Sequence, residues 1–192
     1  MRKSLIERET KETKISMELD LDGSGKADID TGIGFLDHML TLLAFHGGFD
    51  LKIICKGDLN VDSHHTAEDL GITLGEAFRN ALEDKVGIER YGFMILPMDE
   101  ALARIAVDFS GRPCLVYDIE FNNNSMGNMT TEDFKEFFKG FVNNSLCTLH
   151  IGLLYGENDH HKIEAVFKGF GRALKEAVKI TSDNIPSTKG VF

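Results

Sequence analysis

Apolar and polar residues alternate in two stretches of the chain, residues 13–31 and residues 101–121. In the first stretch, Ile15, Met17 and Leu19 are separated by polar residues, and the letters DGSG interrupt the pattern. A period of two is typical of a strand with one buried face, and glycine beside aspartate or serine is typical of a turn. Each stretch therefore predicts a hairpin of two strands, around DGSG in the first and SGRP in the second.

A further series of elements follows each hairpin in the same order. The pattern predicts a helix, a strand and a second helix after the first hairpin, and the same three after the second. These segments are residues 35–46, 49–57 and 64–84 in the first half, and residues 131–146, 148–156 and 160–179 in the second. Each half is therefore predicted as strand–strand–helix–strand–helix, with residues 1–92 and 93–192 as the two repeats. This order favours an α+β fold with sheets on one side and helices on the other.

A constant offset supports the interpretation as a duplication. For the two copies of an HHxxE motif, subtraction gives 160 − 64 = 96 for the first histidines and 164 − 68 = 96 for the glutamates. Gly75 and Gly171 keep the same offset. We interpret the halves as internal repeats. Because glycine lowers the stability of a helix, Gly75 and Gly171 predict a close approach of each helix to a neighbouring element.

Composition and charge restrict the class of protein. The chain has 192 residues, of which 42% are hydrophobic and 27% are charged, so one domain or two small fused ones can form a packed core. The apolar runs are too short to cross a bilayer and the first residues lack the apolar core of a secretory signal, so we expect a cytoplasmic protein without membrane contact. A formal net charge of −10 argues against nucleic acid as a partner. Three isolated cysteines predict reduced thiols.

The HHxxE motif is the candidate for chemistry. On a helix, His64 and Glu68 share a face, whereas the rings of the adjacent His64 and His65 diverge by about 100°. Adjacent histidines therefore predict ligands of two different ions. One such motif is frequently no more than a polar helix start, but its repetition at His160 and His161 favours metal binding. Imidazole and carboxylate ligands suit manganese, iron, cobalt, nickel or zinc, and a site with open positions would be catalytic.

Longer motifs resemble the imidazoleglycerol-phosphate dehydratase family. The resemblance extends almost from end to end and includes TGIGFLDHML, DSHHTAEDLG, DFSGRP and GENDHHKIEAVFKGFGRAL. It implies a duplicated α+β fold of the ribosomal protein S5 domain 2-like type and a hydro-lyase of histidine biosynthesis. The implied reaction is the manganese-dependent dehydration of D-erythro-imidazoleglycerol phosphate, a small phosphorylated imidazole, to imidazole acetol phosphate. The family also implies a homo-oligomer, a trimer-based 24-mer with active sites between subunits.

The resemblance assigns roles to residues of both halves. It implies two Mn²⁺ ions per active site, with the ligands His38, His64, His65, Glu68, Glu136, His160, His161 and Glu164. Many relatives have a histidine where this chain has Glu136, and a solvated surface glutamate is the alternative at that position. The implied substrate-binding residues are Glu12, Arg90, Arg112, Lys168, Ser187, Thr188 and Lys189. The implied catalytic residues are Glu12, His65 and His161.

The family's reaction offers a physical reason for two ions. The hydrogen to be removed is attached to a carbon without an adjacent carbonyl group, so an acid–base pair alone cannot supply the stabilisation. Cations on both ring nitrogens would favour the metal-bound imidazolate, which can expel the hydroxyl group and leave a diazafulvene-like intermediate. A carboxylate would then take the neighbouring proton, and Glu12 is the family's candidate.

Two other classes of function remain open from the residues alone. A dinuclear metallohydrolase would use a bridging hydroxide, but it would favour more aspartate ligands and leaves the basic tail around Lys189 without a purpose. A metal-storage or metal-sensing protein would use repeated ligands without an organic substrate. The roles of two further histidines are also open: His150 alternates in an apolar strand and fits the core, whereas His46 fits a helix cap or a substrate contact.

Overall fold

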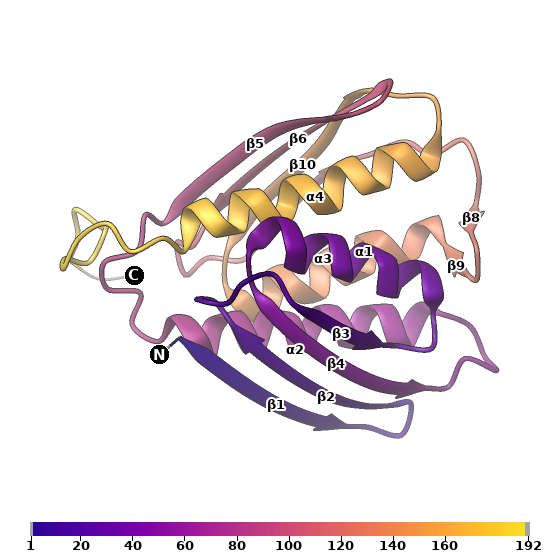
Figure 1. Ribbon diagram of the computed structural model, residues 1–192, viewed down its shortest axis with the longest axis horizontal. Coiled ribbons are helices and arrows are strands. Elements are labelled where there is room, and N and C mark those ends of the chain that lie inside the picture. Colours follow the sequence, from indigo (N-terminus) through magenta and orange to yellow (C-terminus); the bar gives the residue numbers. More distant parts are fainter. Residues whose placement is uncertain (1, 191–192) are drawn as a thin grey trace.

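The structure is a computed structural model that describes residues 2–190 (Figure 1). The first half forms β1 (Lys3–Glu9), β2 (Thr13–Asp20), β3 (Ala27–Asp30), α1 (Gly34–Gly47), β4 (Asp50–Gly57) and α2 (His64–Leu82). The second half forms β5 (Tyr91–Met98), β6 (Ala101–Asp108), β7 (Cys114–Asp118), α3 (Thr131–Ser145), β10 (Thr148–Tyr155) and α4 (Asp159–Ala177). A short hairpin of β8 (Ser125–Met126) and β9 (Met129–Thr130) precedes α3.

Two four-stranded sheets repeat one strand order. The first is β1-β2-β4-β3 and the second is β5-β6-β10-β7. In each half the third strand lies at a sheet edge, parallel to the strand that follows the first helix. That helix therefore connects two parallel neighbours, as α/β crossovers do. The repeated order confirms the predicted α+β duplication.

The strand pattern differs from the expected one in the number of strands and in their order. Each half begins with an additional strand, β1 or β5, whose side chains alternate mainly between exposed and half-buried positions at a sheet edge and so give a weak apolar signal. The boundary expected between residues 92 and 93 falls inside β5. The expected hairpins are wrong, because β4 lies between β2 and β3, and β10 lies between β6 and β7.

The DGSG turn shows why a turn signal did not make a hairpin. The backbone N–H groups of Ser24 and Lys26 donate to Asp50 Oδ1 at 2.7 and 3.0 Å. Asp50 is the first residue of β4, so the turn crosses the end of β4 before β3 begins. A Cβ atom at Gly23 would lie 2.3 Å from the backbone nitrogen of Asp50, which explains a glycine there.

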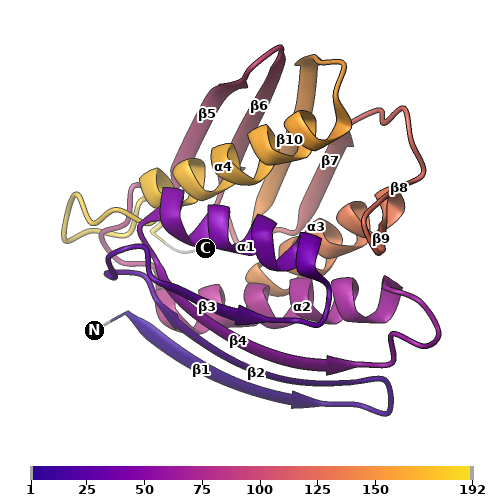
Figure 2. The same ribbon diagram turned by 45° about the vertical axis from the view of Figure 1, so that its right-hand side comes forward.

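The four helices lie between the two sheets (Figures 1 and 2). In each half the helices cover one face of their own sheet, as expected, and the two helical faces then meet in the middle of the molecule. α1 packs against α4, and α2 packs against α3. A Cβ atom at Gly75 would lie 2.4 Å from the carbonyl oxygen of Phe141, and one at Gly171 would lie 2.5 Å from that of Leu43. The prediction of close helix contact is confirmed.

Phenylalanine rings fill the space between the helices. Phe138 of α3 and Phe167 and Phe170 of α4 are fully buried, with ring centroids 5.2 and 5.3 Å from Phe138. Burying each such side chain contributes about 1.5–3 kcal/mol. This packing fixes α4 against α3, so side chains near the helix starts are carried on a rigid support.

All four helices begin at the same end of the molecule, on the right in Figure 1, and we call it the ligand end. The backbone dipoles give the start of each helix a partial positive charge, which favours carboxylates there. The tail that follows α4 lies at the opposite end. Within residues 2–190, no helix combines the length and apolar character needed to span a membrane.

Candidate metal centre

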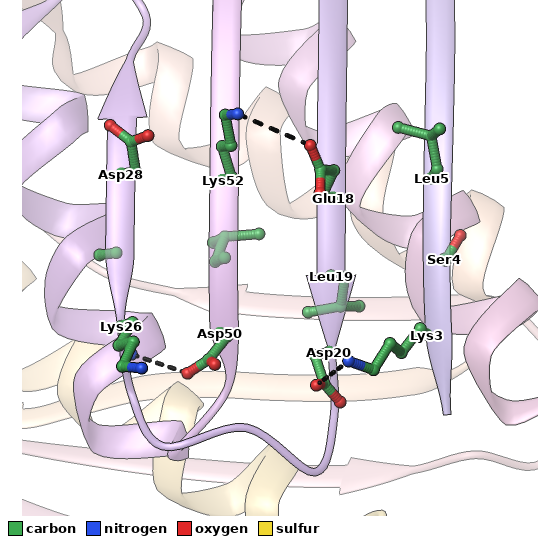
Figure 3. A pocket seen from close by; sticks show the side chains of 12 residues that line it. Lys3, Ser4, Leu5, Glu18, Leu19, Asp20, Lys26, Asp28, Asp50 and Lys52 are labelled. Atoms are coloured by element: carbon green, nitrogen blue, oxygen red, sulfur yellow. Dashed lines mark hydrogen bonds and ion pairs between the residues drawn. The ribbon is translucent and has the colours of Figure 1, made fainter. Parts of the chain in front are cut away.

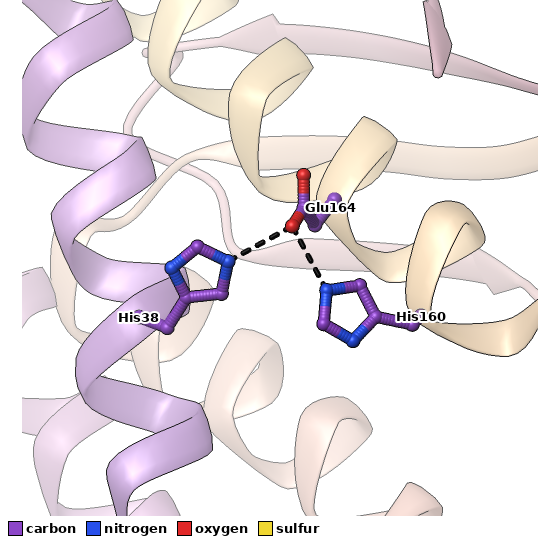
Figure 4. A group of neighbouring side chains, drawn as sticks. All are labelled: His38, His160 and Glu164. Carbon is purple, nitrogen blue, oxygen red and sulfur yellow. Dashed lines mark hydrogen bonds and ion pairs between the residues drawn. The ribbon is translucent and has the colours of Figure 1, made fainter. Parts of the chain in front are cut away.

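Three side chains from two helices converge at the ligand end. His38 projects from α1, and His160 and Glu164 project from one face of α4 (Figure 4). Glu164 Oε1 lies 2.8 Å from His38 Nε2 and 2.9 Å from His160 Nε2. The ligand atoms lie within 4.8 Å of one another, and no other group of three such residues occurs in the described part of the chain. The two halves together therefore build one candidate metal centre.

The start of α4 is fixed by a side-chain cap. Asn158 precedes the helix, and its side-chain oxygen accepts the backbone N–H groups of His160 and His161 at 2.9 and 3.3 Å. Such a cap typically stabilises a helix by about 1 kcal/mol. It also fixes the backbone from which both histidine rings project.

Glu164 is the buried member of the centre. Its side chain is 10% exposed, whereas those of His38 and His160 are 44% and 48% exposed. Burial raises the pKa of Glu164, but hydrogen bonds from Lys168, His38 and His160 outweigh it and lower the pKa to about 2. Lys168 Nζ lies 2.6 Å from Glu164 Oε2. The carboxylate is therefore ionised at neutral pH, which is the form that binds a cation.

The corresponding residues of the first motif do not converge in the same way. His64 and Glu68 lie on α2 and Glu136 lies on α3, all at the ligand end. Glu136 Oε2 pairs with Lys139 Nζ at 2.9 Å within the same helix. The imidazole Nδ1 of His64 lies 3.7 Å from Asp133 Oδ1. Glu136 thus has a cationic partner of its own.

The two histidines of each motif have different carboxylate partners. Their ring planes are 81° apart in the first motif and 88° apart in the second. His65 Nδ1 lies 3.0 Å from Asp58 Oδ2, and His65 Nε2 lies 3.8 Å from Glu12 Oε1. The hydrogen bond with Asp58, followed by the charge of Glu12, raises the pKa of His65. Two of the predicted catalytic residues, Glu12 and His65, are therefore neighbours.

His161 has a similar environment in the second half. Its Nδ1 lies 2.7 Å from Glu100 Oε2, and its Nε2 lies 3.8 Å from Asp99 Oδ2. The hydrogen bond with Glu100 raises the pKa of His161. The same hydrogen bond, with a backbone N–H donated by Asn158, lowers the pKa of Glu100 to about 2.

Most of the predicted substrate-binding residues lie far from this centre within one chain. Lys168 is beside Glu164, but the backbone N–H of Arg90 donates to Ala177 at the far end of α4. A rise of 1.5 Å per residue places that end about 27 Å from the helix start. Arg90 Nη1 donates to the carbonyl oxygen of Pro186 at 2.9 Å, which ties the tail with Ser187, Thr188 and Lys189 to the same end. The carbonyl oxygen of Arg112 accepts a hydrogen bond from Thr148, at the start of β10 and so away from the ligand end.

Comparisons with known proteins decide the family. The family model for imidazoleglycerol-phosphate dehydratase matches residues 31–174. An imidazoleglycerol-phosphate dehydratase of Clostridioides difficile is 63% identical over 187 residues, which cover 97% of each chain. The chain belongs to the imidazoleglycerol-phosphate dehydratase family. It is therefore a hydro-lyase of histidine biosynthesis.

Solved dehydratase structures share the fold. The imidazoleglycerol-phosphate dehydratase of Staphylococcus aureus has a TM-score of 0.85 and 41% identity, and covers 93% of this chain and 99% of that one. The IGPD of Pyrococcus furiosus has a TM-score of 0.85 and 43% identity, and covers 97% of this chain and 100% of that one. The range matched by the dehydratase family model contains both HHxxE motifs, whereas Glu12 and the tail from Ser187 to Lys189 lie outside it.

Sequence reasoning missed three carboxylates of the dehydratase chain. Asp58, Asp99 and Glu100 contact the second histidines, yet none of them belongs to a metal-binding or catalytic motif. The one feature of the sequence that they share is their position in a loop directly after a strand. The role of His150 was left open, and its side chain is exposed on β10 rather than in the core. His46 is half-buried in the last turn of α1, where Gly48 occupies the cap position.

Two grooves of the dehydratase chain lie away from the metal centre. One of about 540 Å³ lies on the outer face of the first sheet (Figure 3). Its charges are compensated locally, with Lys3 Nζ 2.8 Å from Asp20 and Lys52 Nζ 3.7 Å from Glu18. A second, of about 650 Å³, is lined by His46, Phe93, Met94, Ile95, Arg172, Lys175, Glu176 and Lys179. Neither groove contains a residue of the metal centre.

The donor set of the centre fits the metal that the dehydratase family implies. Two imidazole nitrogens and an ionised carboxylate are ligands that Mn²⁺ accepts, together with iron, cobalt, nickel and zinc. The half-exposed rings of His38 and His160 leave a side open toward solvent, and open positions are typical of catalytic sites.

Proposed function

We propose that this chain removes water from D-erythro-imidazoleglycerol phosphate to give imidazole acetol phosphate, with two Mn²⁺ ions in each active site. The observation that carries the proposal is the convergence of His38 Nε2 and His160 Nε2 on one carboxylate oxygen of Glu164. Membership of the dehydratase family supports the reaction. The metal and the mechanism are the parts that the proposal adds.

The proposed ligands belong to two sets, one from each pair of packed helices. His38, His160 and Glu164 form the set between α1 and α4; the set between α2 and α3 is His64, Glu68 and Glu136. His65 and His161 would bind ions outside these sets through their Nε2 atoms. When bound, the ions would act as Lewis acids that stabilise negative charge on the substrate's imidazole ring.

The chain's own residues would prepare this site before substrate binds. Glu164 is held as a carboxylate, and Lys168 neutralises its second oxygen at 2.6 Å. Lys168 is also close enough to the centre to attract an anionic phosphate ester. Glu12 is exposed beside His65 Nε2, so its carboxylate is available to accept the proton removed from the substrate carbon.

The distance between the ligand end and the tail supports an active site shared between subunits. At 1.5 Å per residue, Ala177, which Arg90 contacts, lies about 20 Å along α4 from Glu164 and about 26 Å from His160, so Arg90 and Lys189 cannot reach the metal centre of their own chain. We infer that Arg90, Arg112, Ser187, Thr188 and Lys189 bind the phosphate at the ligand end of a neighbouring copy. This arrangement requires a homo-oligomer, for which we propose the trimer-based 24-mer of the family.

The direct test is turnover of imidazoleglycerol phosphate by Mn-loaded protein. Product is followed by its absorbance after treatment with base, which reveals the enol form of the ketone. We expect product with Mn²⁺, none after chelation, and recovery when Mn²⁺ is added back. A His160→Ala variant should lose activity and bound manganese together. Hydrolysis of the phosphate ester without dehydration, or turnover that persists after complete chelation, would contradict the proposal.

A further inference from the structure

One contact is made in both halves by residues that are not equivalent. The second histidine of each motif has a carboxylate at Nδ1, from Asp58 at 3.0 Å and from Glu100 at 2.7 Å. Asp58 follows β4, the fourth strand of its half, whereas Glu100 lies in the turn between the first two strands of its half. A relic of the duplication would use equivalent positions. The same contact from different positions indicates that the contact itself is required.

Hydrogen bonds hold the carboxylate of Glu100 and the backbone of Asp58. Glu100 Oε1 accepts the backbone N–H groups of Glu157 and Asn158 at 3.1 and 2.7 Å, which leaves Oε2 for His161. The backbone N–H of Asp58 donates to the carbonyl oxygen of Glu12 at 3.0 Å, and Asp58 Oδ1 is buried without a partner in the described part of the chain. The Glu100 carboxylate is therefore held with Oε2 toward His161, and the backbone of Asp58 is held beside Glu12.

An ionised carboxylate can only accept a hydrogen bond, so the proton of the neutral imidazole must lie on Nδ1. Nε2 then keeps its lone pair and is the atom available to bind a cation. A carboxylate behind a metal-binding histidine also raises the basicity of the ring. In both halves the freed Nε2 faces a loop carboxylate at 3.8 Å, that of Glu12 for His65 and that of Asp99 for His161.

We propose that Asp58 and Glu100 are positioning residues that hold His65 and His161 in the tautomer with a free Nε2 and so set their affinity for the metal. The inference rests on the proposed function in taking His65 and His161 as ligands. The tautomer itself is a property of the metal-free protein and is measured separately.

The sharpest variant is Glu100→Gln. Two backbone N–H groups require the oxygen of the new amide, so its NH₂ group must face His161 Nδ1 and donate to it. His161 should then change to the tautomer with the proton on Nε2, which ¹⁵N chemical shifts detect in metal-free protein. Mn²⁺ affinity, measured by competition with a chelator, should fall roughly 10- to 100-fold. Glu157→Gln is the matched control, because it removes the same charge next to Asn158 and should change neither the tautomer nor the affinity.

Asp58→Ala tests the first half independently. Without an acceptor at Nδ1, His65 should populate both tautomers, and Mn²⁺ affinity should again fall while the thermal unfolding midpoint confirms that the variant is folded. The proposal is overturned if His161 or His65 of the wild type carries its proton on Nε2, or if Glu100→Gln and Glu157→Gln lower the affinity equally. Failure of the wild-type protein to dehydrate imidazoleglycerol phosphate would instead contradict the proposed function.

Discussion

Glu164 and Glu136 are both helical glutamates at the ligand end, but their carboxylates have different partners. Glu164 contacts two histidines and Lys168, and hydrogen bonds from these three donors keep the carboxylate ionised despite its burial. Glu136 pairs instead with Lys139, three residues later in the same helix. The two candidate ligand sets are therefore not equivalent: one has two imidazoles and one carboxylate, and the other has one imidazole and two carboxylates. At the scale of single residues, the type of each ligand and the partner of each carboxylate decide how strongly a ligand set attracts a cation.

Lys139→Met is expected to increase the Mn²⁺ affinity of the set that contains Glu136. The hydrogen bond with Glu136 raises the pKa of Lys139, so a charged ammonium competes with the metal for that carboxylate. Because an exposed ion pair is screened by solvent and weak, the gain should be at most about fivefold. Titration of Mn²⁺ by calorimetry measures it. Lys135→Met removes the same charge from the same helix and is the control; an equal gain in both variants would show a general charge effect.

Glycines decide how the helices approach one another at the scale of elements. A Cβ atom at Gly71 of α2 would lie 2.1 Å from the carbonyl oxygen of Phe137 on α3. A Cβ atom at Gly140 of α3 would lie 2.7 Å from the carbonyl oxygen of Glu68. The backbones of α2 and α3 are therefore in direct contact beside two proposed metal ligands. The close approach of the two helices therefore requires glycine at both positions.

Gly71→Ala should destabilise the protein and disturb the neighbouring ligand set. The added methyl group forces the two helices apart, and overpacking of this kind costs about 1–3 kcal/mol. Gly34→Ala is the matched control, because a Cβ atom there would meet nothing within 4 Å and alanine favours a helix. Urea denaturation of both variants measures the difference. Equal stability of the two variants would contradict the close packing of α2 on α3.

The Asp50 carboxylate should make the stability of the DGSG turn depend on pH. Backbone hydrogen bonds from Lys26 and Ser24 lower the pKa of Asp50 below its ordinary value of 3.8. The ionised carboxylate therefore stabilises the fold above that value, and the contribution is lost as the pH falls through the lowered pKa. We expect Asp50→Asn to be less stable than the wild type at neutral pH, with a difference that shrinks in acid. Denaturation midpoints at several pH values would reveal a pH-independent difference if this interpretation is wrong.

The whole molecule separates its two kinds of candidate chemistry. All four helix starts, with the imidazoles and carboxylates, lie at the ligand end, and Arg90 and the tail lie at the other (Figures 1 and 2). The pairing of α1 with α4 and of α2 with α3 crosses between the halves, so neither repeat alone contains a complete ligand set. A single chain therefore cannot complete the proposed site for a phosphorylated imidazole. In the proposed function, a neighbouring copy supplies the phosphate contacts.

Mixed assemblies should recover activity from two inactive variants. His161→Ala lacks a proposed metal ligand, and Lys189→Ala lacks a proposed phosphate contact. If each site takes these residues from different chains, random reassembly of an equal mixture should restore roughly a quarter of the sites, since each contributing chain is intact half the time. Activity per chain after dissociation and reassembly measures this. Mixtures that remain as inactive as the separate variants would place both residues in a site within one chain.

The sequence by itself determined the duplication, the identity of most elements and the candidate ligands. Hydrophobic periods and motif spacing are local properties, so they are readable without knowing which elements touch. The pairing of His38 with His160 and Glu164 across the repeats was decided only by the packing of α1 on α4. Strand order was also decided by tertiary structure. β4 lies between β2 and β3 in the sheet, although only a turn sequence separates β2 from β3 in the chain. The contacts of Asp58 and Glu100 were likewise decided only by tertiary structure. The sequence around a loop carboxylate does not show which side chain the fold places beside it.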